Sequence, residues 1–187
     1  MTRALLAAIA ILLVQACTAP TSLPATSSPI RQAEIPVATA APALFAPTAA
    51  AKPTDGGCGN TTVLTGGIPD TLKRSTGDNA PSGVPYAVAR PATAAGFIFG
   101  YPLHMPSAGI GYSNKILWVV GKPREGAELR IIGHPLEAST PEVQTSAPAG
   151  SSPGEIYPSI VDVPRPGCWR FDLYWAGHTA AAELLYT

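Results

Sequence analysis

The residues with the most distinctive chemistry in this sequence are its three cysteines, Cys17, Cys58 and Cys168. The first follows residues 1–16, MTRALLAAIAILLVQA, in which one arginine precedes a short apolar run and an alanine stands directly before the cysteine. Such a segment is typical of a secretory signal peptide, and it is shorter than the ~20 residues that a transmembrane helix requires. We therefore expect residues 1–16 to be removed when the chain is exported.

The junction Val14-Gln15-Ala16-Cys17 resembles the lipobox of bacterial lipoproteins, with an aliphatic residue three places before the cysteine and a small residue beside it. The resemblance implies that the signal is cut before Cys17 and that acyl chains, palmitate among them, anchor this residue in a membrane. Thr18 stands where an Asp commonly retains lipoproteins in the inner membrane. We expect the protein to be lipid-anchored at the extracytoplasmic face of the cell membrane or of the outer membrane. An ordinary secretory signal with an unmodified Cys17 is the alternative.

Cys58 and Cys168 remain as a pair once Cys17 is set aside. Outside the cytoplasm such a pair is most simply a disulfide bond. It would close a loop of roughly 110 residues and stabilise the fold by on the order of 4 kcal/mol in the chain-entropy model. Two separately buried thiols are the alternative.

Three histidines offer metal-binding nitrogens: His104, His134 and His178. Met105 would suit copper if all three converged, but no HxH or HxxxH spacing aligns any two of them. No H-E-x-x-H, P-loop or S-x-x-K motif indicates an enzyme either. We therefore expect no metal, no cofactor and no enzymatic activity. The alternative is a hydrolase, or a copper or zinc protein, with a site built from loops.

Composition excludes nucleic acid as an expected partner. Charged residues make up only 13% of the chain, and its formal net charge is zero. Proteins that bind nucleic acid carry a basic surface that neutralises phosphates. Because Lys and Arg do not outnumber Asp and Glu in this sequence, we expect no such basic surface.

Residues 17–54 are rich in Ala, Pro, Thr and Ser, and a proline recurs every few residues. Frequent proline prevents helix formation, and a chain of this composition cannot bury a core. We therefore expect a disordered linker that begins at the lipidated Cys17 and holds a domain away from the membrane. The apolar segment Ala43-Leu44-Phe45 is a candidate to dock on that domain.

The folded domain is expected at residues 55–187, where short strand-like segments alternate with Gly, Pro, Asn and Asp. No segment of ten or more residues has helical periodicity, and residues 71–79 are expected to form a polar loop. Many short strands with turn-rich connections are typical of an antiparallel β-sandwich. The expected strands cover residues 61–65, 86–90, 96–103, 115–120, 128–132, 143–146, 159–163, 168–175 and 180–186.

Residues 168–175, CWRFDLYW, alternate large apolar residues with polar ones, which is the period of a half-buried strand. Ala176-Gly177-His178 then predicts a turn into a second strand, because glycine supplies the positive φ that short hairpins require. The alternating apolar side chains are expected in the core. Tyr174 and Trp175, at the end of the strand, are a candidate binding platform for a sugar or a protein if both are exposed.

Trp118, in the apolar run Ile116–Val120, and Cys168, which opens a later strand, resemble the buried Trp and the strand-F Cys of immunoglobulin folds. With the segments KILWVVG, YPSIVDVP and PGCWRFDLYWAGH, the chain is similar to secreted or lipid-anchored bacterial proteins that end in an immunoglobulin-like β-sandwich. The resemblance implies that fold. Since Cys58 lies far before Trp118, the disulfide is expected to tie the N-terminal edge of the domain to the sheet.

Taken together, these features predict a lipid-anchored, extracytoplasmic bacterial lipoprotein with a non-catalytic role in binding or envelope interaction. The expected partners are the membrane, through Cys17, and an envelope protein or a glycan.

Overall fold

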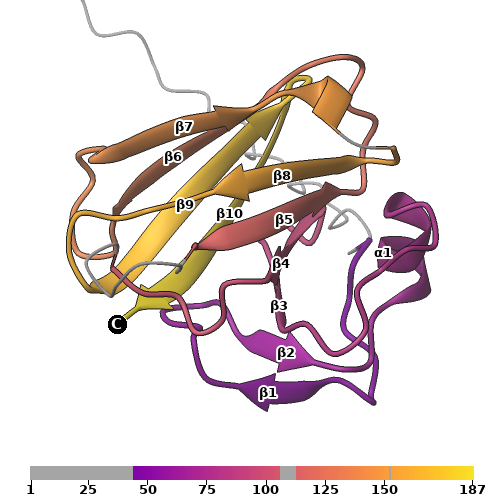
Figure 1. The fold of residues 1–187 in the computed structure, drawn as a ribbon, viewed down its shortest axis with the longest axis horizontal. Coiled ribbons are helices and arrows are strands. Elements are labelled where there is room, and N and C mark those ends of the chain that lie inside the picture. The colour runs from indigo at the N-terminus through magenta and orange to yellow at the C-terminus, as the bar shows by residue number, and fades with distance from the viewer. Residues whose placement is uncertain (1–43, 106–112, 152) are drawn as a thin grey trace, which may run out of the picture. The chain divides into compact units, whose positions relative to one another are not determined.

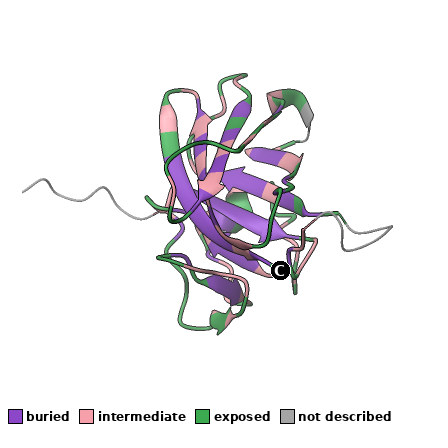
Figure 2. Cartoon of the chain, turned by 90° about the vertical axis from the view of Figure 1, so that its left-hand side faces the viewer, coloured by how far each residue is buried: buried purple, intermediate pink, exposed green. Residues whose placement is uncertain are grey.

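The computed structural model describes residues 44–105, 113–151 and 153–187, and these residues belong to one compact unit. They form ten β-strands, one short α-helix and one 3-10 helix (Figure 1). The strands are largely buried and the connections between them largely exposed, as Figure 2 shows. Among the described residues, no helix has the length and apolar character needed to cross a membrane.

The strands form two antiparallel sheets that pack face to face as a sandwich, which confirms the predicted all-β class. The first sheet has the order β1-β2-β3-β4-β5-β8, with β1 (Lys52–Thr54), β2 (Val63–Thr65), β3 (Tyr86–Val88), β4 (Ala94–Ile98), β5 (Lys115–Val120) and β8 (Ile156–Ile160). The second has the order β10-β9-β6-β7, with β6 (Leu129–Pro135), β7 (Val143–Ala147), β9 (Gly167–Trp175) and β10 (His178–Tyr186).

The core between the sheets comes from side chains that alternate along each strand. In β9 the inward residues are the predicted ones, Trp169, Phe171, Leu173 and Trp175, and all four are buried. Trp118 of β5 belongs to the same cluster. Period-two alternation therefore identifies the core face of β9 correctly.

Strand β5 is buried on both of its faces, as its continuous apolar sequence predicts. Trp118 and Ile116 point into the core between the sheets. Val119 points the other way, into a second cluster that covers the outer face of the six-stranded sheet. This second cluster contains Phe45, Leu64, Leu72, Tyr86, Ala95, Phe97, Val119 and Ile156.

A short helix, α1 (Asp70–Ser75), contributes Leu72 to this second cluster. The expected polar loop at residues 71–79 is therefore wrong in its first half. Six residues are too few to show helical periodicity, yet Asp70 in the first turn and Lys73 in the last turn favour a helix through its dipole. Lys73 donates a 2.9 Å hydrogen bond to Asp70 and thereby lowers the pKa of that carboxyl.

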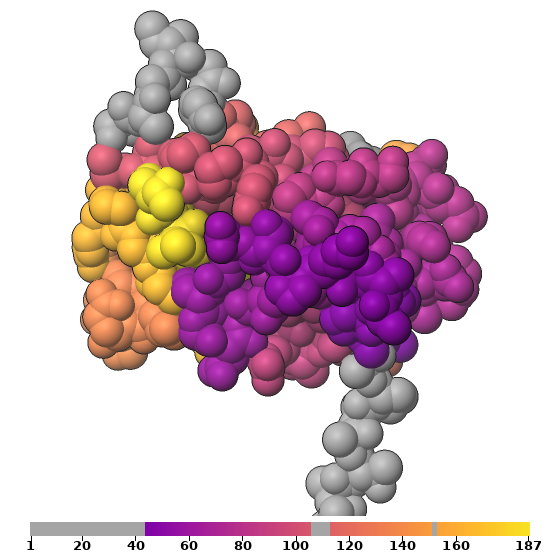
Figure 3. Space-filling model, turned by 90° about the horizontal axis from the view of Figure 1, so that it is seen from below, coloured from indigo at the N-terminus to yellow at the C-terminus, as the bar shows by residue number. Residues whose placement is uncertain are grey.

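The folded region begins before residue 55, so the predicted linker is too long at its C-terminal end. Phe45 is fully buried, its N–H donates to the carbonyl of Ala92, and β1 pairs with β2. The predicted docking of the segment around Leu44 and Phe45 is confirmed. Burial of the aromatic side chain of Phe45 stabilises this contact, although the surrounding sequence is rich in Pro and Ala. In Figure 3 the indigo residues, which are the first that the structure describes, lie beside the yellow C-terminal end.

The order of the strands is that of an immunoglobulin-like sandwich extended at its N-terminus. The sheet β10-β9-β6-β7 corresponds to strands G, F, C and C′, and β5 and β8 correspond to B and E. Cys168 therefore opens the strand-F equivalent, as the resemblance implies. Trp118, however, lies on β5, one strand earlier than the Trp of immunoglobulin strand C. It faces the same core from the opposite sheet.

Two of the sheet edges are covered. Gly57 and Arg90 form isolated bridges to β10, so the edge of that strand meets the N-terminal part of the chain. At the edge strand β8, Pro158 has no N–H to offer, and Arg124 donates to the carbonyl of Ile156 at 2.8 Å. Edges blocked in this way resist pairing with a further strand.

Candidate functional site

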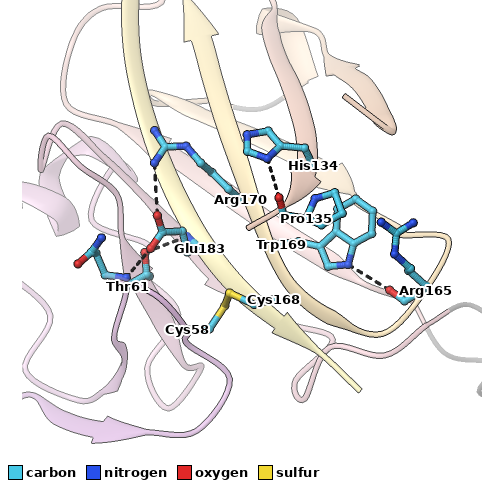
Figure 4. Close-up of a disulfide and its surroundings, with 10 residues drawn as sticks. Cys58, Thr61, His134, Pro135, Arg165, Cys168, Trp169, Arg170 and Glu183 are labelled. Atoms are coloured by element: carbon cyan, nitrogen blue, oxygen red, sulfur yellow. Dashed lines mark hydrogen bonds and ion pairs between the residues drawn. A yellow bond between two sulfur atoms is a disulfide. The ribbon is translucent and has the colours of Figure 1, made fainter. Parts of the chain in front are cut away.

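The disulfide between Cys58 and Cys168 is formed, with 5.9 Å between the two Cα atoms (Figure 4). Cys58 lies in the connection between β1 and β2, and Cys168 is the second residue of β9. The bond therefore ties the N-terminal part of the domain to the four-stranded sheet, as the sequence predicts. The Cys58 N–H also donates to the carbonyl of Glu183 on β10, at 3.4 Å.

Glu183 is a carboxylate held beside this disulfide, and only 4% of the residue is exposed. Its Oε2 accepts the backbone N–H of Asn60, and its own N–H donates to Thr61 Oγ1 at 2.8 Å. The close approach depends on Gly59, because a Cβ there would lie 2.2 Å from Glu183 Oε2. A glycine with φ of +54° lets the loop close over the carboxylate.

A chain of charged side chains continues from Glu183 across the outside of the four-stranded sheet, and Figure 4 shows its first pair, Glu183 and Arg170. Arg170 Nη1 lies 3.3 Å from Glu183 Oε1, and Arg170 Nε lies 3.1 Å from Asp172 Oδ1. Asp172 Oδ2 in turn lies 3.7 Å from His134 Nε2. These side chains come from β6, β9 and β10, whose pairing brings residues distant in sequence side by side.

We call the outward-facing side of β6 and β9 the polar face. Its half-buried and exposed residues alternate with the buried core residues of the same strands. The face is rigid, since each of its members stands on a strand paired on both sides. Its residues are Arg130, Ile132 and His134 on β6 and Arg170, Asp172 and Tyr174 on β9.

The polar face ends in a groove at the hairpin that joins β9 to β10. The groove is a shallow, open depression with a volume of about 520 Å³. The Arg130 guanidinium stacks on the Tyr174 ring, 4.8 Å from its centroid. The lining residues are Glu128, Arg130, Tyr174, Trp175, Ala176, Gly177, His178 and Thr179.

The predicted platform of Tyr174 and Trp175 is wrong for Trp175. That residue is only 2% exposed, because its side chain occupies the inward face of β9 and packs in the core. Tyr174 faces outward and lines the groove. Neighbouring residues of a strand point to opposite sides, so the two rings could not share one exposed surface.

The three histidines have separate surroundings. His104 Nδ1 lies 2.8 Å from Thr187 Oγ1, and the His178 ring lies 5.7 Å from that of Trp175. His134 is engaged at both ring nitrogens, with Nδ1 2.8 Å from the carbonyl oxygen of Pro135. Within the described part of the chain, no three His, Cys, Asp or Glu side chains come together as a metal site.

Residues 150–154, GSSPG, match the G-x-S-x-G pattern of hydrolase nucleophiles, with Ser152 at its centre. In hydrolases this pattern forms the sharp turn between a strand and the helix that follows it. Here it lies between β7 and β8, two strands of an antiparallel sandwich. The structural context of the motif is therefore missing. Ser152 itself, like Cys17, lies outside the described residues.

The sequence does not single out Glu183 or Arg130. Glu183 is the one charged residue in the apolar stretch TAAAELLY, and that contrast is the only signal of its special environment. Arg130 alternates with Leu129 and Ile131 as any surface residue of a strand does. Their importance arises from strand pairing.

Comparison with models of protein families, with curated protein sequences and with solved structures finds no match to this chain.

Proposed function

We propose that this chain is a lipid-anchored, extracytoplasmic bacterial protein whose β-sandwich binds a glycan of the cell envelope in the groove at the β9–β10 hairpin. The role is binding rather than catalysis. The observation that carries the proposal is the groove itself, which joins a stacked Arg130–Tyr174 pair to polar side chains on a rigid sheet.

The groove offers both donors and acceptors of hydrogen bonds. Arg130 donates only, Glu128 accepts when ionised, and the hydroxyl of Thr179 does both. Sugars present many hydroxyls that each donate and accept, so this mixed lining suits them better than it suits a ligand with one kind of charge. Aromatic rings such as that of Tyr174 add an apolar surface with a polar rim.

Compartment and anchoring are supported by the cysteines. The Cys58–Cys168 bond belongs to an oxidising environment, where disulfides form and persist. The signal-like residues 1–16 and the lipobox-like junction before Cys17 fit the same location. Two acyl chains hold a protein on a membrane far more firmly than one does.

Binding is tested with a chain of residues 17–187 that carries Cys17→Ser and no lipid, applied to arrayed bacterial polysaccharides. Arg130→Ala and Tyr174→Ala should each weaken binding by about tenfold or more, as losses at central binding residues do. Arg165→Ala is the matched control, because Arg165 also stacks on an aromatic ring, that of Trp169 at 5.5 Å, without lining the groove. Equal losses in all three variants, or none, would place the site elsewhere.

Anchoring is tested by fractionation of cells that express the whole chain with Cys17 or with Cys17→Ser. The wild type should label with radioactive palmitate and sediment with membranes. The variant should do neither. Equal membrane retention of both proteins would remove the lipoprotein assignment and favour an ordinary secretory signal.

A further inference from the structure

A row of three side chains crosses one end of the six-stranded sheet on its outer face. Lys115 of β5 pairs with Ile160 of β8, and the N–H of Phe99, just past β4, donates to the Lys115 carbonyl at 2.9 Å. The Lys115 Nζ lies 5.2 Å from the centroid of the Phe99 ring. Phe99, Lys115 and Ile160 therefore form one contiguous patch, which we call the outer patch.

The outer patch contains two large apolar side chains that are exposed to solvent. Phe99 is 45% exposed and Ile160 is 59% exposed, and the only other large apolar side chain exposed to this degree in the described residues is Leu136, at 38%. Leu136 follows β6 in the other sheet. Two of the three thus lie on either side of β5, flanking one cation.

The charge of Lys115 is not balanced nearby. Across the described part of the chain, no carboxylate oxygen lies within ion-pair distance of its Nζ. Asp162, the nearest acidic residue after Ile160 in the chain, accepts a 2.8 Å hydrogen bond from Asn114 Nδ2 instead. The patch therefore combines exposed apolar surface with one free positive charge.

We propose that the outer patch rests on an anionic lipid surface, with Phe99 and Ile160 inserted at the headgroup level and Lys115 among the lipid phosphates. Apolar side chains beside a cation are the features of proteins that lie on membranes. The two exposed side chains present on the order of 200 Å², far below the ~800 Å² per partner that a stable protein interface buries. Charge complementarity favours an anionic surface over a neutral one.

The position of the chain's entry supports this orientation. Leu44 and Phe45, the first described residues, pack on the same outer face of the six-stranded sheet as the patch, near Gly121 beyond the far end of β5. The six residues of β5 span roughly 20 Å, and the residues from Cys17 to Leu44 are numerous enough to bridge that distance, since a chain can cover up to ~3.3 Å per residue. A lipid at Cys17 therefore allows the patch to reach the bilayer. This step rests on the proposed anchoring.

The test uses residues 17–187 with Cys17→Ser, which removes the lipid and leaves only the patch. The chain should sediment with vesicles made of equal parts phosphatidylcholine and phosphatidylglycerol. Its binding to vesicles of pure phosphatidylcholine should be weaker. Phe99→Ser and Ile160→Ser should each lower partitioning about fivefold. Lys115→Gln should lower it to a similar degree on the anionic vesicles only. Leu136→Ser is the matched control and should bind as the parent does.

A second measurement places the lipidated chain in nanodiscs that carry nitroxide-labelled lipids. The backbone amide signals of residues 99, 115 and 160 should broaden more than that of residue 136. Equal broadening, or vesicle binding that the three substitutions leave unchanged, would overturn the proposal. So would a concentration-dependent dimer that Phe99→Ser dissociates, which would assign the patch to a second copy of the chain. Failure here leaves the palmitate and fractionation results of Cys17→Ser intact, so the two proposals can be judged separately.

Discussion

Arg170 and Glu183 face each other across β9 and β10, with 3.3 Å between Arg170 Nη1 and Glu183 Oε1. The pair connects the half-buried polar face to the loop that the disulfide holds, because the same carboxylate accepts the N–H of Asn60. A charge so deeply buried persists only when it is paired and hydrogen-bonded. The loop that contains Asn60 therefore helps to stabilise the buried Glu183 carboxylate on the four-stranded sheet.

Glu183→Ala should lower the free energy of unfolding by about 1–3 kcal/mol, since it leaves the Asn60 N–H and Arg170 Nη1 without their acceptor. Glu183→Gln should lower it less, because the amide oxygen can still accept from Asn60. Urea denaturation followed by tryptophan fluorescence measures both. Glu128→Ala, at an exposed position, is the control and should stay within about 0.5 kcal/mol of wild type. Equal losses for all three variants would contradict the role given to the carboxylate.

Loss of the disulfide should destabilise the domain by about 2–5 kcal/mol. In the double variant Cys58→Ala, Cys168→Ala, hydrogen exchange should quicken most at the amides of positions 58 and 185, whose N–H groups donate to the carbonyls of Glu183 and Gly56. Hydrogen exchange of the backbone amides that pair β6 with β9 should change least. Alkylation of two free thiols in the folded, oxidised protein would show that the bond does not form.

Stability should fall in alkaline solution because three tyrosines are buried. Burial raises the pKa of Tyr186 above its ordinary value, and the charge of Asp162 adds to this effect. Burial also raises the pKa values of Tyr86 and Tyr157. Unfolded tyrosine ionises near pH 10. The folded state therefore binds more protons above that pH, and the stability present below pH 10 is lost as pH rises toward the folded pKa values.

Tyr186→Phe provides the test of this pH dependence. Near neutral pH it should cost about 0.5–1.5 kcal/mol, because the hydroxyl donates a 2.8 Å hydrogen bond to the carbonyl of Val161. As pH rises above about 10, wild type should lose stability faster than the variant, so the difference between them should shrink. Urea midpoints compared from about pH 8 to about pH 11 would decide the matter. Parallel curves would rule out Tyr186 as a source of the dependence.

In the β9–β10 turn, a substitution at Ala176 should stabilise the protein and one at Gly177 should destabilise it. Ala176 and Gly177 both have positive φ, +41° and +75°, as the two central residues of a type I′ turn do. Ala176→Asn should raise stability by about 0.5–1 kcal/mol, because Asn tolerates this conformation better than Ala. Gly177→Ala should lower it by about 1 kcal/mol or more. Thermal unfolding measures both, and changes of the same sign would contradict the turn assignment.

Some features of this protein could be predicted from the sequence because they depend on neighbouring residues. The alternation from Trp169 to Trp175 marks a half-buried strand wherever that strand lies, and Gly177 marks the turn that follows. The pairing of Cys58 with Cys168 follows from counting, since these two cysteines remain once Cys17 is set aside. Helix α1 escaped prediction because six residues carry no period, and the early start of the domain escaped it because one buried aromatic, Phe45, stands in a proline-rich stretch.

The candidate surfaces were decided by tertiary structure alone. Phe99, Lys115 and Ile160 look ordinary in the sequence and become a patch only because β4, β5 and β8 pair in register. Tyr174 becomes part of a groove, and Trp175 part of the core, because the register of β9 fixes which side of the sheet each faces. Glu183 and Asn60 are far apart in the chain and meet because backbone contacts to β10 and the disulfide hold the segment that precedes Asn60 against the sheet. Local sequence specifies period and turn, whereas the contacts that could bind a partner arise from pairing between distant segments.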